Sequence, residues 1–314
     1  MAGDKLLQEA LKDILCCPEC KNELRLVNGN ELKCQQCFQK YDIKNGIPVL
    51  ICGDRIKDQP AEWKMREKTA KEQGYTHPEE ILRHVSFHHC LPVMSKKARS
   101  YRKKFSSSRW ILDIGSGTGW YWASTSGGNI LLLDFAFENL MAAKTLLGND
   151  GQVLPIQANS GLLPIKTNCL SGLWSVQATQ HFPEPVIVPF LQETKRVLKD
   201  KFLVEIYNLN PAWIHKIIYG LFGKKYHTKG KWGNMVFNRL NKNELNTLWR
   251  DVARDAITSI GYSELFFHPD FRLCPKGEYI SIFEDVFNKL PGSLGRTFAR
   301  QIHIKISSRV GFNE

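Results

Sequence analysis

Short apolar runs alternate with amphipathic stretches from residue 110 to residue 207. Five runs have the length and composition of buried strands, namely 110–114, 130–134, 153–158, 170–176 and 201–207. Helical periodicity marks the stretches 136–147 and 186–199 between them. Strand and helix in repeated alternation predict an α/β fold with a doubly wound, mostly parallel sheet covered by helices on both faces.

The flanking regions carry other patterns. Residues 4–15 place their apolar side chains on one side of a helix, and 17–52 predict short strands around an Asn28-Gly29 turn. Residues 243–260 have helical spacing, whereas 301–306 alternate strictly, with three isoleucines on one face. This alternation predicts a half-exposed antiparallel strand at the end of the sheet.

These patterns divide the chain into three parts. We expect a small zinc-binding domain over 1–52, a helical connector over 53–105 and the α/β domain over 106–314. Within the last part, the aromatic and basic residues 211–240 form a lid-like insertion. At helical spacing Ile214, Ile217, Ile218 and Leu221 share one face, a pattern typical of core packing and also of a lid over an apolar pocket.

Composition narrows the class of protein. The chain has 314 residues, of which 43% are apolar, so it is not a disordered chain. It has no apolar run long enough for a transmembrane helix, and acidic residues interrupt its first 15 positions, where a signal peptide would be apolar. We therefore expect a cytoplasmic protein.

The net charge of +12 is concentrated in two segments. Residues 95–109 hold seven basic and no acidic side chains, and 211–231 hold five lysines and no acid. Such segments fit an RNA partner, an anionic acceptor or peripheral contact with a membrane surface, and they are also common on solvated faces.

Four cysteines have the spacing of metal ligands. Cys17, Cys20, Cys34 and Cys37 form two C-x2-C turns separated by 13 residues, a pattern that can place four thiolates around one Zn²⁺. Four protein ligands complete a tetrahedron, so the site is expected to be structural. Cys16 is an alternative to Cys17, although the Cys-Pro-x-Cys turn favours Cys17.

The cysteine pattern, the hairpin between the pairs and the ending YDIKNGIPVLI resemble a known small domain. It is the Trm112-like zinc-binding domain that activates transfer-RNA and protein methyltransferases. The resemblance covers residues 10–52, and fused copies of this domain precede many bacterial methyltransferases. It implies structural zinc and says little about the substrate.

A glycine-rich loop follows the first predicted strand of the α/β domain. The sequence Asp113-Ile-Gly115-Ser-Gly117-Thr-Gly119 allows a tight turn and a close approach of backbone to a ligand. Asp134 ends the next strand, 21 residues after Asp113, where a carboxylate can meet the ribose hydroxyls of a nucleoside cofactor. A helix cap is the ordinary alternative for Asp134.

Together with Asn159 and Ser160, these features resemble class I S-adenosylmethionine-dependent methyltransferases over residues 106 to 306. The resemblance implies that the loop cradles the methionine and ribose, that Asp134 holds the ribose and that Phe135 flanks adenine. Asn159 with Ser160 would read the adenine edge, and Gln177 would line the methyl-donor pocket. The implied cofactor residues are Asp113, Gly115, Ser116, Gly117, Gly119, Asp134, Phe135, Asn159, Ser160 and Gln177.

Methyl transfer needs donor and acceptor in line, and a general base is optional. His181, just beyond the fourth strand, is the candidate base, with packing or helix capping as the alternative. The sequence favours a small-molecule or lipid- or glycan-linked acceptor. An RNA base methyltransferase is the alternative, and a noncatalytic S-adenosylmethionine-binding module is the least favoured.

Overall fold

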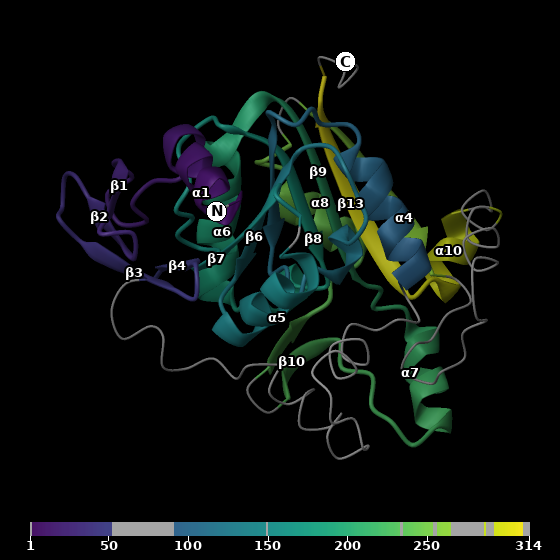
Figure 1. The fold of residues 1–314 in the computed structure, drawn as a ribbon. Helices are drawn as coiled ribbons and strands as arrows, with labels where there is room; N and C mark the ends of the chain where they lie inside the picture. The colour runs from purple at the N-terminus through teal and green to yellow at the C-terminus, as the bar shows by residue number, and fades with distance from the viewer. Residues whose placement is uncertain are drawn as a thin grey trace.

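The computed structural model describes residues 2–51, 91–148, 150–232, 235–253, 256–264, 286 and 292–309. The predicted connector over 53–105 therefore lies largely outside the described residues. Its described end is helix α4 (Leu91–Arg102). Figure 1 shows the cysteine-containing segment at one end of a long sheet and helices α7 and α10 at the other.

Eleven strands form one sheet in the order β1-β2-β3-β4-β7-β6-β5-β8-β9-β13-β12. The central strands are parallel neighbours and begin and end close to the predicted residues: β5 (Trp110–Ile114), β6 (Asn129–Asp134), β7 (Val153–Ala158), β8 (Leu170–Val176) and β9 (Leu198–Leu209). The chain reverses its direction of travel across the sheet between β5 and β8. In open α/β sheets this point is where ligands bind.

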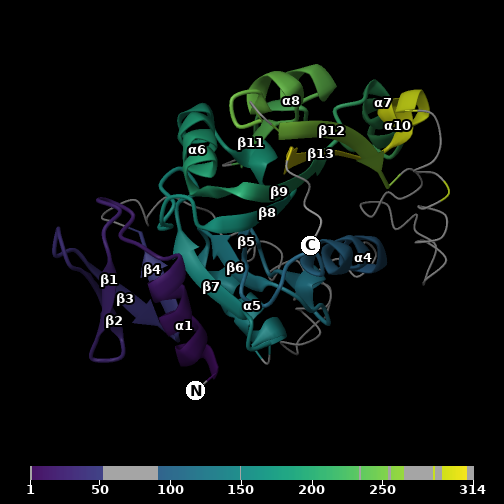
Figure 2. The same ribbon diagram turned by 90° about the horizontal axis from the view of Figure 1, so that it is seen from above.

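Helices cover both faces of the sheet, as predicted for a doubly wound fold. One apolar cluster joins the sheet to α1 (Ala2–Asp13), α6 (Glu184–Val197) and α8 (Lys242–Trp249). A second cluster joins the opposite face to α4 and α5 (Phe137–Leu147). Figure 2 shows α6 and α8 on one side of the strands and α4 and α5 on the other.

The cysteine-containing segment extends the same sheet. Its strands are β1 (Leu24–Val27), β2 (Glu31–Cys34), β3 (Lys40–Lys44) and β4 (Ile47–Leu50). Strand β4 pairs in parallel with β7, with Val49 opposite Gln157 and Leu50 opposite Ala158. Helix α1 packs in the same core as β7, so the first 51 residues and the α/β domain share apolar packing and backbone pairing.

Two strands at the other end of the sheet differ from the prediction. Residues 256–260, expected to be helical, belong to β12 (Ala256–Ser263), which forms the edge of the sheet. Strand β13 (Gln301–Ser308) is antiparallel as predicted but lies between β9 and β12. The expectation of a strand at the sheet's end was wrong because β12 adds beyond it and buries its second edge.

The predicted insertion contains helix α7 (Trp213–Leu221) and a hairpin of β10 (Lys229–Trp232) and β11 (Met235–Asn238). Helix α10 (Gly292–Phe298) contacts α7. Among the described residues, no helix is both long and apolar enough to cross a bilayer.

Candidate active site and metal centre

The glycine loop lies at the point where the strand order reverses. Gly115, Gly117 and Gly119 all have left-handed backbone conformations, with φ between 56° and 60°. A Cβ on Gly115 would lie 2.3 Å from the Cβ of Ala178, in the segment that follows β8. The loop therefore requires glycine at 115, and it places its backbone against the end of β8.

Asp134 fixes this loop. Its Oδ2 accepts a hydrogen bond from the Gly117 backbone N–H at 2.8 Å. Its Oδ1 accepts from the Ala136 N–H at 2.8 Å and from the Asn139 side-chain amide at 3.1 Å. Asp134 thus ties the end of β6 to the loop and also satisfies a donor at the start of α5. The carboxylate therefore lies beside the loop, whereas the N-cap residue of α5 is Ala136 and no side chain caps the helix.

Asp113 is fully buried beneath the loop. Its Oδ2 accepts hydrogen bonds from the Tyr121 hydroxyl at 2.8 Å and from the Trp122 indole at 2.7 Å. Burial raises the pKa of this carboxyl to about 7. Tyr121 and Trp122 were not singled out from the sequence, although two aromatic side chains with polar hydrogens directly after a glycine loop are the signal that marks them.

Two buried polar atoms of the loop lack a partner within the described residues. Among the described residues, Oγ of the buried Ser116 and Oδ1 of Asp113 have no hydrogen-bond partner. A cofactor with an amino and a carboxylate group can satisfy such atoms, and the bare backbone at Gly115 and Gly117 leaves room for its approach. The residues of the loop therefore fit S-adenosylmethionine.

The remaining predicted cofactor residues follow the neighbouring strands. Phe135 follows β6, and its carbonyl accepts a hydrogen bond from the Gln157 amide at 2.7 Å. Asn159 follows β7, and its Oδ1 accepts from the Gly161 N–H at 2.8 Å, as in an ordinary Asx turn. Asn159, Ser160 and Phe135 are all partly exposed at the carboxyl edge of the sheet.

Gln177 and His181 follow β8. Gln177 has a left-handed backbone, with φ 58°, which is unusual for a residue other than glycine and is common at functional sites. The His181 Nδ1 lies 2.8 Å from the Val236 carbonyl, and its Nε2 lies 3.1 Å from the Gln180 amide nitrogen. With Nδ1 donating and Nε2 accepting, His181 holds the β10–β11 hairpin over the end of β8. This geometry favours the packing alternative over a general base.

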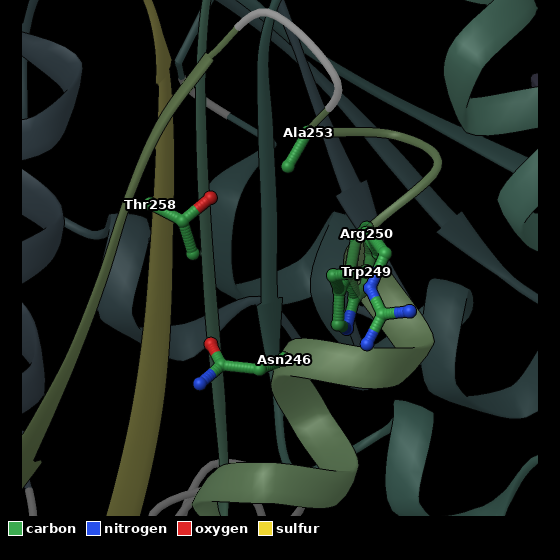
Figure 3. Close-up of a pocket in the computed structure, with 5 residues that line it drawn as sticks. All are labelled: Asn246, Trp249, Arg250, Ala253 and Thr258. Atoms are coloured by element: carbon green, nitrogen blue, oxygen red, sulfur yellow. The ribbon is translucent and has the colours of Figure 1, made fainter.

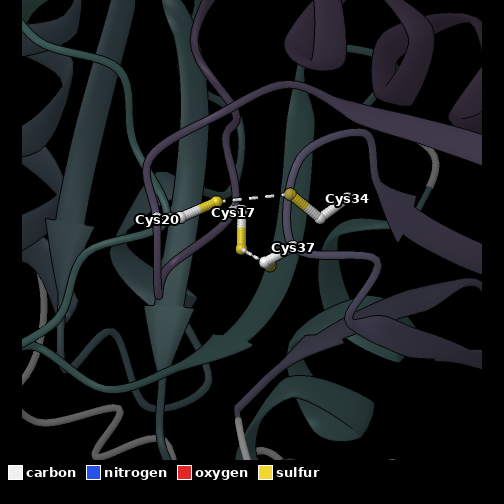
Figure 4. Close-up of side chains that lie close together, drawn as sticks. All are labelled: Cys17, Cys20, Cys34 and Cys37. Carbon is white, nitrogen blue, oxygen red and sulfur yellow. Dashed lines mark hydrogen bonds between the residues drawn. The ribbon is translucent and has the colours of Figure 1, made fainter.

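The four predicted metal ligands lie together (Figure 4). Their sulfur atoms are all within 4.8 Å of one another, with 3.7 Å between Cys17 and Cys37 and 3.4 Å between Cys20 and Cys34. Tetrahedral Zn–S bonds of about 2.3 Å place sulfurs about 3.8 Å apart. The backbone N–H of Asn22 lowers the pKa of the Cys20 thiol to about 6. The set fits one structural Zn²⁺.

The structure also decides between Cys16 and Cys17. Cys17 belongs to the cluster, whereas Cys16 is buried outside it and its N–H donates to the Pro164 carbonyl at 3.0 Å. Cys16 therefore belongs to the contact between the zinc-binding segment and the α/β domain.

A salt bridge strengthens that contact. Lys21, directly after Cys20, has a left-handed backbone, with φ 61°. Its Nζ donates to Glu193 of α6 at 2.9 Å and to the Leu163 carbonyl at 2.9 Å. The metal-binding turn is thereby fixed to the helix that covers the sheet.

A pocket between α8 and β12 lies away from the glycine loop. Its volume is about 260 Å³, and its walls are Asn246, Trp249, Arg250, Ala253 and Thr258 (Figure 3). Thr258 lies opposite Ile306, which lies opposite Val204 in the middle of β9. The pocket is therefore set back from the carboxyl ends of β5 and β8, and we assign it no role in the reaction.

The two basic segments have different environments. In 95–109, Arg102 is buried and pairs with Asp150 at 2.9 Å, and Lys104 donates to Glu205 at 3.5 Å. Tyr101 and Phe105 are buried in the core. All five lysines of 211–231 are exposed: Lys216, Lys224, Lys225, Lys229 and Lys231.

Helix α7 buries a different face from the one predicted. Its buried side chains are His215 and Tyr219. Trp213 is 62% exposed and Leu221 79% exposed, and Ile217 and Phe222 are also exposed. Of the two interpretations of this pattern, core packing does not apply to Ile217 and Leu221, because the helix packs through His215 and Tyr219 and leaves an apolar ridge outside.

Comparison with known proteins identifies both parts of the chain. Residues 112–203 match the family described as a methyltransferase domain, and residues 8–46 match the Trm112p-like protein family. A UPF0434 protein of Vesicomyosocius okutanii is 44% identical over 46 residues, which are 15% of this chain and 76% of that protein. A UPF0434 protein of Methylobacillus flagellatus is 43% identical over 53 residues, covering 17% and 87%.

One solved structure is similar over most of this chain. It is a complex between the Trm112 methyltransferase activator of Haloferax volcanii and a protein described as a methyltransferase. The match has a TM-score of 0.51 and 14% identity, and covers 80% of this chain and 99% of that one. This likeness supports the fold. The chain therefore carries a Trm112p-like domain at residues 8–46 ahead of a methyltransferase domain at residues 112–203.

Proposed function

We propose that the chain methylates a small apolar or lipid-linked metabolite, which it reaches at an anionic lipid surface. The observation that carries the proposal is the exposed face of α7. Trp213, Ile217 and Leu221 are spaced by four residues and form one apolar ridge, and the lysines at 216, 224 and 225 flank it. An exposed apolar ridge with a basic border is the pattern by which helices bind anionic lipid surfaces.

The proposed cofactor site lies at the carboxyl ends of β5, β6 and β7. The backbone of Gly115, Ser116, Gly117 and Gly119 would hold the methionine part, with the buried Asp113 supporting the loop from below. Asp134 would accept from the ribose hydroxyls. Phe135, Asn159 and Ser160 would bound the adenine, and Gln177 would line the side from which the acceptor approaches. The support is their common position after the carboxyl ends of neighbouring parallel strands, next to the point where the strand order reverses.

S-adenosylmethionine supplies an activated methyl group, so the protein's main task is to hold the acceptor in line with it and to exclude water. The insertion is suited to this task because β11 contacts the turn Thr179–His181 at the end of β8. His181 holds the hairpin there through its bond to Val236. We therefore assign His181 a positioning role.

RNA is a less favoured acceptor. Two of the seven basic side chains of the first segment, Arg102 and Lys104, form ion pairs within the chain, whereas Lys96, Arg99 and Lys103 are exposed, so charge alone does not decide against RNA. The aromatic side chains of that segment, Tyr101 and Phe105, are buried and cannot stack on bases. The exposed lysines of the second segment lie beside apolar side chains, which suits a lipid better than a nucleic acid.

The fused Trm112-like segment would support the catalytic domain from within the chain. Its strand β4 pairs with β7, which leads directly to Asn159 and Ser160. In the similar complex the activator is a separate protein. We infer that fusion replaces that association here.

The α7 ridge is tested by the triple variant Trp213→Ser, Ile217→Ser and Leu221→Ser. Because these side chains are exposed, the fold and the affinity for S-adenosylhomocysteine should be unchanged. Sedimentation with vesicles of anionic phospholipid should fall at least tenfold, and methyl transfer into a lipid extract should fall with it. The matched control is Val188→Ser with Ile257→Ser, which removes exposed apolar side chains elsewhere. Equal vesicle binding and transfer by the triple variant and the wild type would contradict the proposal.

A further inference from the structure

Arg239 is a buried arginine with unusual surroundings. It follows β11, and its side chain is only 7% exposed. Its guanidinium carbon lies 4.1 Å from the centre of the Tyr226 ring and 5.2 Å from the centre of the Phe237 ring. Within the described part of the chain, neither Nε nor Nη1 has a hydrogen-bond partner. Aromatic rings therefore orient the group, while two of its nitrogens, which carry three N–H donors, have no acceptor among the described residues.

Two other buried arginines among the described residues each pair with a carboxylate. Arg102 pairs with Asp150 at 2.9 Å, and Arg300 pairs with Glu264 at 2.9 Å. Removing a guanidinium from water without a carboxylate or phosphate partner is costly, and burial lowers the pKa of Arg239 from its usual value. An arginine retained in this state fits a function that supplies the anion from outside the chain.

Arg239 is close to the proposed acceptor site. The Phe237 ring that it contacts also lies 5.1 Å from the ring of His181, which follows β8 beside Gln177. Tyr226, the other ring, donates a hydrogen bond to the Asn210 carbonyl just beyond β9, at 2.7 Å. The cluster therefore covers the carboxyl ends of β8 and β9, next to the strand ends where the methyl donor is placed.

We propose that Arg239 binds an oxyanion of the methyl acceptor, a phosphate or a carboxylate group. The inference rests on the proposed function, because it deepens the description of the same site. The guanidinium can donate a charge-assisted hydrogen bond from Nη1 to an oxygen of such a group, and the flanking rings hold it in place before the acceptor arrives. On this proposal the acceptor has an apolar part, which α7 contacts, and an anionic group, which Arg239 binds.

The test measures anion binding without methyl transfer. Wild-type protein saturated with S-adenosylhomocysteine is titrated with inorganic phosphate and separately with acetate, at ionic strength held constant with chloride. We expect saturable binding of at least one anion, and Arg239→Met should weaken it at least tenfold. Arg250→Met, which removes an exposed arginine from the end of α8, is the matched control and should leave the dissociation constant unchanged.

A stability measurement separates this role from a structural one. If Arg239 serves to bind an anion, Arg239→Met without phosphate should have a thermal midpoint equal to or above that of the wild type. Phosphate should raise the thermal midpoint of the wild type and leave that of Arg239→Met unchanged. A lower midpoint together with unchanged anion binding would show that the stacked guanidinium is structural and would overturn the inference. Failure of both anions to bind the wild type would also overturn it.

Failure of this inference can be distinguished from failure of the proposed function. Anion binding through Arg239 with no methyl transfer into any lipid or small molecule would leave the anion site standing and would refute the proposed reaction. Transfer into a lipid extract at the wild-type rate by Arg239→Met would refute the anion site alone.

Discussion

Asp134 offers the sharpest test of the proposed cofactor site. Replacing it with alanine removes the carboxylate that would accept from the ribose hydroxyls, and a hydrogen bond to a charged group is worth about 1.5–3 kcal/mol. The affinity for S-adenosylmethionine should therefore fall by roughly 10- to 150-fold. The same change removes three hydrogen bonds inside the protein, to Gly117, Ala136 and Asn139, so we also expect a lower free energy of unfolding.

Calorimetry with S-adenosylhomocysteine measures the affinity, and urea unfolding measures the stability. Asp134→Asn keeps one acceptor oxygen and should lie between the wild type and the alanine variant. Glu138→Ala, which removes a carboxylate from the first turn of α5, is the control and should bind the cofactor normally. Unchanged affinity in a folded Asp134→Ala protein would refute the placement of the ribose.

Two further predictions concern the metal and the buried carboxyl. Metal analysis should find one zinc per chain. The double variant Cys34→Ser with Cys37→Ser should lose the zinc and lower the thermal midpoint of the whole chain, because β4 is paired with β7. Protein that is purified without chelators and lacks zinc would contradict this prediction. The pKa of Asp113 is about 7 in the folded protein, and its ordinary value is 3.8. Between these pH values the folded state therefore binds more protons than the unfolded state. The free energy of unfolding falls as the pH rises, by up to about 1.4 kcal/mol per pH unit. Urea unfolding at pH 5 and pH 8 should show this loss in the wild type and not in Asp113→Asn, and equal losses in both would exclude Asp113 as its source.

The parallel strands were predictable because they are buried on both faces. The run Trp110–Ile114 is apolar except for Asp113, and the predicted and observed bounds of β5 coincide. Residues 256–260 misled the prediction because Thr258 and Ser259 belong to an exposed edge strand, where polar and apolar positions are less regular. Helix α8 ends shortly before this strand, so a continued helix was the simpler interpretation of the sequence.

Contacts between distant segments were not predictable in the same way. The cysteine spacing located a metal site, but nothing near Val49 indicated that β4 would pair with β7, which lies about one hundred positions further along the chain. Arg239 also carried no signal in the sequence. Its role depends on two rings and on the lack of a carboxylate partner among the residues that the structure describes, which no local sequence pattern encodes.

The central claim is that the chain transfers methyl groups from S-adenosylmethionine to an anionic lipid-linked or small apolar acceptor. The most direct test is to incubate the protein with S-adenosylmethionine labelled in the methyl group and with fractionated cell extract, and to count label in RNA, protein, lipid and small molecules. We predict label in the lipid or small-molecule fraction, lost with Asp134→Ala. Label confined to RNA or protein, at a rate that depends on Asp134, would contradict the account.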